Sequence, residues 1–149
     1  MNGTLLFALL AAGAGACIAL QASANGAFRK NLDDPALAAF FSICGTFATA
    51  VLFMLIVRPA PPSAEALRST SWWNWVGGPL GALIVLAGAA LTPRLGAAAF
   101  IACVVGGQLL SSMVLDHFAL MGLPEQAITP GRVLGALLVV AGVVCIKYL

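Results

Sequence analysis

The sequence predicts an all-α integral membrane protein with five transmembrane helices, and three observations support that prediction. Hydrophobic residues make up 62% of the 149 positions and charged residues 8%, against roughly 45–50% and 25% in soluble domains. The apolar residues are concentrated in five stretches, each close to the ~20 residues that cross a bilayer as a helix. Each stretch is continuously apolar, whereas the strands of a membrane barrel alternate over about ten residues.

The first apolar stretch covers about residues 4–24, and a joint with basic and acidic side chains, from Arg29 to Asp34, follows it. Pro35 then opens the second stretch, residues 35–57, at a position where a helix tolerates proline. A cleavable signal peptide is the alternative for the first stretch. The residues that precede that stretch carry no Lys or Arg, which disfavours this alternative.

The other three spans are expected at about residues 73–91, 95–118 and 131–148. A tryptophan cluster within residues 72–75 marks the membrane interface at the start of the third span, because indole rings prefer the headgroup level. Pro93 and Arg94 are expected to form a very short turn, which makes the third and fourth spans antiparallel neighbours. The five spans together predict a single membrane domain over residues 1–149.

A polar stripe on the fourth span is the main candidate for a functional site. Gln108, Ser112 and Asp116 recur every four residues, and Ser111 lies beside them. Asp116 alone among the acidic residues falls within a predicted span, where an ionised side chain costs roughly 2.5–3.5 kcal/mol at the helix centre. The stripe is therefore expected to face the bundle interior or a watery cavity.

Asp116 is followed by His117, and the two are the only acid and imidazole neighbours in the chain. A carboxylate and an imidazole in a membrane span suit coupling to a proton gradient. The alternative places Asp116 at the membrane interface, in an ion pair with a joint residue such as Arg132, and makes His117 an interfacial histidine.

Two amide side chains on the first span, Gln21 and Asn25, are four residues apart and so lie on one helix face. They are candidates for contact with a substrate. The alternatives are hydrogen bonds to a neighbouring helix, or a helix cap formed by Asn25 with Gly26.

Three residues near the start of the third span, Gly77, Gly78 and Pro79, are candidates for a flexible point in that helix. The chain has no nucleophile and base arrangement, phosphate-binding glycine loop or metal-ligand spacing. We therefore expect neither an enzyme nor a bound metal or cofactor. The net charge of +2 is scattered without a run of Lys or Arg, which argues against nucleic acid as a partner.

Basic residues are almost evenly divided between the two faces of the predicted bundle. The face with the amino terminus has Arg58, Arg68 and Arg132, and the opposite face has Arg29, Lys30, Arg94 and Lys147. An excess of Lys and Arg normally fixes orientation, so this chain is expected to insert both ways. Two copies in opposite orientations would form an antiparallel homodimer with the inverted-repeat architecture of many transporters. A heterodimer with a separately encoded partner and a parallel dimer are the alternatives.

Five segments resemble one known family. They are ALQASANGAFRK (residues 19–30), WWNWVGGPLGA (72–82), PRLGAAAF (93–100), GGQLLSSMVLDHFALMG (106–122) and GRVLGALLVVAGV (131–143). In this order they resemble the YdcZ-like proteins, small five-span members of the drug/metabolite transporter superfamily that are related to the ten-span EamA-type transporters. The chain departs from the family pattern where Ala119 stands in place of a glycine.

The resemblance implies a secondary transporter in the inner membrane of a bacterium, each chain being one half of an inverted-repeat unit. In that role the chain would move a small metabolite or cation, coupled to a gradient through Asp116. Its partners would be the lipid bilayer, a small-molecule substrate and a second five-helix half. The alternative from another class is a non-transporting membrane subunit that docks to a larger membrane partner.

Overall fold

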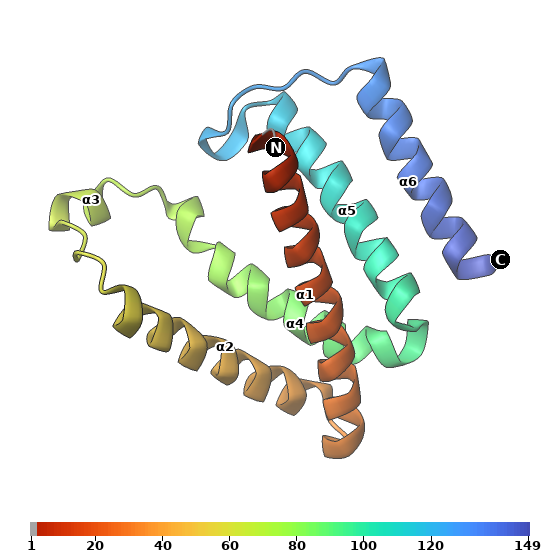
Figure 1. Cartoon of the computed structure of the whole chain (residues 1–149), viewed down its shortest axis with the longest axis horizontal. Helices are drawn as coiled ribbons and strands as arrows, with labels where there is room; N and C mark the ends of the chain where they lie inside the picture. The colour runs from red at the N-terminus through yellow and green to blue at the C-terminus, as the bar shows by residue number, and fades with distance from the viewer. Residues whose placement is uncertain (1–2) are drawn as a thin grey trace. The chain divides into compact units, whose positions relative to one another are not determined.

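The computed structural model describes residues 3–149, and its regular structure is helical (Figure 1). Five helices in this part of the chain are long and apolar enough to cross a membrane. They are α1 (Gly3–Leu32), α2 (Pro35–Val57), α4 (Gly77–Leu95), α5 (Ala97–His117) and α6 (Pro130–Tyr148). Three short helices occupy the joints: α3 (Ala64–Arg68), η1 (Trp72–Trp75) and η2 (Leu120–Gly122). The predicted all-α membrane fold is confirmed.

The chain divides into two compact units, Met1–Arg94 and Leu95–Leu149. The first unit contains α1 to α4, and the second contains α5, η2 and α6. The units are clusters of contacts within one chain, and a single membrane domain stays a prediction.

The helix α1 extends beyond residue 24, the predicted end of the first span. The helix continues through Arg29 and Lys30 to Leu32, and the chain turns only at Asp33, whose φ is 53°. Nothing between Asn25 and Leu32 breaks a helix except Gly26, which a helix interior tolerates at a cost of ~1 kcal/mol. The alternative of a cap formed by Asn25 is therefore wrong.

The start of α2 agrees with its predicted start at Pro35. Asp34 is the N-cap, and its Oδ1 accepts hydrogen bonds from the backbone N–H groups of Ala36 (2.6 Å) and Leu37 (2.9 Å). These bonds satisfy two of the four donors that a helix start leaves free.

The joint between α4 and α5 also differs from its prediction. Pro93 and Arg94 lie inside α4, and the break falls at Gly96, whose φ of 83° glycine adopts without a steric penalty. A proline disturbs the turn that precedes it, so the residues after Pro93 can still be helical. The expected turn at Pro93 and Arg94 is therefore wrong, and α4 runs beyond the predicted end of the third span.

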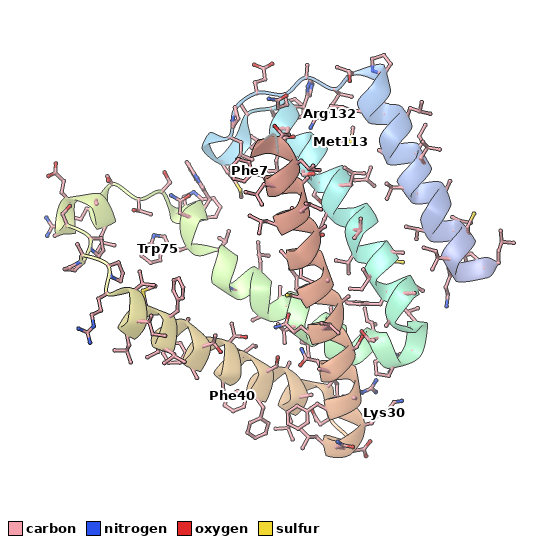
Figure 2. The ribbon with its side chains drawn as sticks, in the orientation of Figure 1. Phe7, Lys30, Phe40, Trp75, Met113 and Arg132 are labelled. Atoms are coloured by element: carbon pink, nitrogen blue, oxygen red, sulfur yellow. The ribbon has the colours of Figure 1, made fainter. Side chains whose placement is uncertain are left out.

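In the first unit, α1 packs against α2 at the end where the two helices join (Figure 1). The buried residues of α2, Ala38 and Ala39, lie in its first two turns. Phe40, which follows them and is labelled in Figure 2, is 59% exposed, and residues 43–57 are all exposed. Such a surface is suited to contact with lipid or with another apolar helix.

In the second unit, α5 packs against α6 (Figure 1). A small residue lies in this contact, since a Cβ built on Gly106 would be 3.6 Å from Cγ2 of Val143. Thr129 caps α6, its Oγ1 accepting a hydrogen bond of 3.3 Å from the backbone N–H of Arg132. Pro130 occupies the first turn of α6, where the lost N–H has no helical partner.

Candidate functional site

The polar stripe of α5 belongs to the second unit, which leaves most of it exposed. Gln108, Ser111 and Ser112 are exposed, and Asp116 is half-buried. Ser112 Oγ donates to the backbone oxygen of Leu109 at 3.0 Å, a local bond that leaves the hydroxyl on the helix surface. On a membrane-spanning helix, such a stripe requires water or another polar surface beside it.

Asp116 forms an ion pair with Arg132. Arg132, which is labelled in Figure 2, lies at the start of α6. Arg132 Nη2 lies 2.5 Å from Asp116 Oδ2, and the two side chains are 33% and 27% exposed respectively. The structure thus contains the ion pair that the sequence analysis gave as the alternative for Asp116. The pair joins the carboxyl end of α5 to the amino end of α6.

Two further hydrogen bonds extend this ion pair into the intervening loop. Arg132 Nη1 donates to the backbone oxygen of Gln126 at 2.8 Å, and the N–H of Gln126 donates to the backbone oxygen of Asp116 at 2.9 Å. Gln126 is therefore held by both members of the pair. This network ties the loop between α5 and α6 to Asp116, at the end of the polar stripe.

His117 is half-buried and makes its aromatic contact with Phe118, whose ring lies edge-on at a centroid distance of 4.7 Å. Its Nδ1 is buried and has no hydrogen-bond partner within residues 3–149. Its imidazole is therefore not bonded to the carboxylate of Asp116, as expected for adjacent residues about 100° apart on a helix.

The two amides predicted on one face of α1 lie in different surroundings. Gln21 is exposed, whereas Asn25 is only 5% exposed and its Nδ2 lacks an acceptor among the described residues. Asn25 belongs to a buried stripe with Ala22 and Gly26. This stripe faces α4, because a Cβ built on Gly26 would be 3.3 Å from side-chain atoms of both Thr92 and Pro93.

Sequence reasoning missed two residues at this crossing, Arg29 and Thr92. Arg29 Nη1 donates to the backbone oxygen of Ala90 at 3.1 Å, so a residue assigned to a wet joint reaches α4. Thr92 is 7% exposed, and its Oγ1 has no partner in the described part of the chain. The four-residue spacing of Asn25 and Arg29 was the available signal, since it places both on one face once the helix continues.

Gly77, Gly78 and Pro79 form the first turn of α4. The two glycines line an open groove of about 390 Å³ between α2 and α4, opposite Phe47. A second hollow of about 250 Å³ continues it and shares Ile43 and Ala82 with the first. Pro79 occupies a helix start, where proline is accommodated without a kink. A flexible point at these residues stays a prediction.

A helical chain that crosses the membrane several times and carries a polar stripe on a spanning helix has the features of a membrane transporter. No group of three or more metal-ligating side chains occurs within residues 3–149. The family described as "Putative inner membrane exporter, YdcZ" matches residues 6–145. The chain belongs to this family, and it is a multi-pass protein of the bacterial inner membrane.

One curated relative gives a more detailed comparison. The chain is 37% identical over 78 residues to "Inner membrane protein YdcZ" of Escherichia coli (strain K12). The alignment covers 52% of this chain and 52% of the relative, so the match spans about half the length of each. No solved structure matches the chain. The family supports a transporter role and gives no support to an enzyme.

Proposed function

We propose that the chain is one half of a secondary transporter that exports a small metabolite or cation, with a second copy in the opposite orientation as the other half. The observation that supports this most directly is the exposed stripe of Gln108, Ser111 and Ser112 on α5. Within the second unit these polar groups have no cover. A second half would convert the open surface into a lined pathway, as in transporters built from inverted repeats.

In this proposal Asp116 exchanges its partner during transport. It pairs with Arg132 in one state, and with a proton or a substrate cation in another. Partial exposure of both side chains supports this exchange, because a pair of this kind is held by only ~1 kcal/mol or less and water can reach it. Gln21 and Gln108 would supply neutral hydrogen bonds to the substrate.

Inverted membrane vesicles test the coupling, with ethidium as a fluorescent cationic probe. Vesicles that contain the wild-type chain should accumulate ethidium when a proton gradient is imposed, and vesicles with Asp116→Asn should lose this accumulation while inserting the variant normally. Glu125→Gln is the matched control, because Glu125 is an exposed acid in the joint that follows α5. Normal gradient-driven accumulation by Asp116→Asn contradicts the proton role.

The alternative, a non-transporting subunit sealed against a larger partner, makes a different prediction for the polar stripe. A water-soluble thiol reagent should label Ser112→Cys in a transporter and miss it in a sealed assembly. Leu138→Cys is the control for an apolar surface, since Leu138 is 64% exposed on α6. The four natural cysteines are first replaced. Absence of labelling at position 112 in intact membranes would favour the subunit.

A further inference from the structure

The crossing of α1 and α4 contains unused hydrogen-bond donors in a buried place. Asn25 and Thr92 are 5% and 7% exposed, and within residues 3–149 neither Asn25 Nδ2 nor Thr92 Oγ1 has a partner. A buried polar group without a partner costs about 1–3 kcal/mol. Two such groups near one contact therefore indicate that something absent from the chain itself bonds to them.

A positive charge lies at the same crossing. Arg29 is half-buried, is four residues from Asn25 on the same face of α1, and reaches α4 at Ala90. No carboxylate in the described residues forms a salt bridge with Arg29. Asp33 and Asp34 follow Arg29 by four and five residues, and Oδ1 of Asp34 caps α2. The guanidinium of Arg29 thus has no direct carboxylate partner among the described residues.

The two helices approach closely at this crossing. Gly26 lies against Thr92 and Pro93, and a Cβ placed on it would be in a tight contact of 3.3 Å with their side chains. The backbone of α1 can approach α4 this closely because Gly26 has no side chain. Asn25 immediately precedes Gly26, and Thr92 lies two residues after Ala90, the residue that Arg29 contacts.

We propose that the crossing of α1 and α4 binds an oxyanion, a carboxylate or a phosphate, through Arg29, Asn25 and Thr92. An amide N–H, a hydroxyl and a guanidinium are all donors, and together they match an anionic oxygen. A cationic ligand is disfavoured because Arg29 would repel it. The site lies in the first unit and does not depend on Asp116 or on the proposed transport cycle.

This chemistry could come from a free anion or from the phosphate of an anionic lipid. Both sources are tested on the full-length chain purified in a neutral detergent. Thermal unfolding is recorded in sodium acetate, sodium phosphate and sodium chloride at equal ionic strength, and native mass spectrometry measures retained phosphatidylglycerol. Arg29→Gln and Thr92→Val remove one donor each, and Arg29→Lys keeps the charge. Lys30→Gln is the control, because it removes an equal charge from the adjacent, exposed residue.

We expect acetate or phosphate to raise the Tm of the wild-type chain and of Lys30→Gln. Arg29→Gln and Thr92→Val should weaken the apparent Kd about tenfold or more, the effect of losing one hydrogen bond to a charged group, and Arg29→Lys should recover part of it. If only phosphatidylglycerol retention changes in this pattern, the oxyanion is a lipid phosphate. Equal behaviour of Arg29→Gln and Lys30→Gln in both measurements would overturn the site.

Discussion

At the scale of single residues, Ala119 has a backbone conformation that favours glycine. It directly follows Phe118, which caps α5, and has φ 49° and ψ 36°, in the left-handed region. A residue with a Cβ pays roughly 1–2 kcal/mol there, whereas glycine does not. The glycine that the resemblance leads us to expect at this position would adopt this conformation without that cost.

Replacing Ala119 with glycine should stabilise the protein. The relief of strain outweighs the added freedom of the unfolded chain, and we expect a gain of about 0.5–1 kcal/mol. Thermal unfolding of the purified protein in detergent measures the gain. Ala127→Gly is the control, because Ala127 is a loop residue without a positive φ, and it should lower stability. A lower Tm for Ala119→Gly would contradict this explanation.

The ion pair of Asp116 and Arg132 can be tested by a double-mutant cycle. Because both side chains are about one-third exposed or less, the coupling energy between Asp116→Asn and Arg132→Gln should be at most about 1 kcal/mol. Unfolding free energies of the two single variants and the double variant give this coupling. A value near zero would mean that the loop is held by the backbone of Gln126 alone.

At the scale of elements, the packing of α1 against α4 depends on a small residue at one position. A Cβ placed on Gly26 would lie 3.3 Å from side-chain atoms of Thr92 and Pro93. A Cβ placed on Gly13 would have no neighbouring atom within 4 Å. Both glycines are on α1, so the two positions separate a packing effect from a change in helix propensity.

Gly26→Leu should separate α1 from α4 and destabilise the protein by about 1–3 kcal/mol, the usual cost of overpacking a close contact. Gly13→Leu should be neutral or slightly stabilising, since leucine is the better helix former and meets no neighbour. Thermal unfolding of both variants in the same detergent provides the comparison. Equal Tm values for the two would show that the crossing is not a tight contact.

At the scale of the whole molecule, the number of spans and the distribution of charge lead to a prediction about orientation. Five helices within the described residues are long and apolar enough to span a membrane, and an odd number of crossings would place the amino end of α1 and the carboxyl end of α6 on opposite sides. Three basic residues on one face and four on the other give little preference between the two orientations.

Dual insertion can be measured with a single cysteine placed after Leu149, the natural cysteines having been replaced. A membrane-impermeant reagent should label about half of the copies in intact cells, and the rest after permeabilisation, if the charge balance leaves orientation open. Labelling from one side only would exclude the antiparallel homodimer. The second half would then be a separately encoded partner or a copy in a parallel assembly.

The sequence alone determined the fold class and the number of spans, because continuous apolar length is a direct requirement of the bilayer. It also located the polar stripe of α5, since a period of four residues places side chains on one helix face. The same period placed Asp116 on this stripe, and an ion pair with Arg132 was one of the two interpretations that the sequence offered for it.

Only the tertiary structure decided where helices end and which polar groups meet. Local signals near Asn25 and Pro93 indicated helix ends, but α1 continues to Leu32 and α4 to Leu95. Arg29, which was predicted to lie in a joint, is therefore part of α1 and contacts Ala90. A contact between residues 61 positions apart depends on how two helices cross, and no local pattern in either helix encodes that crossing.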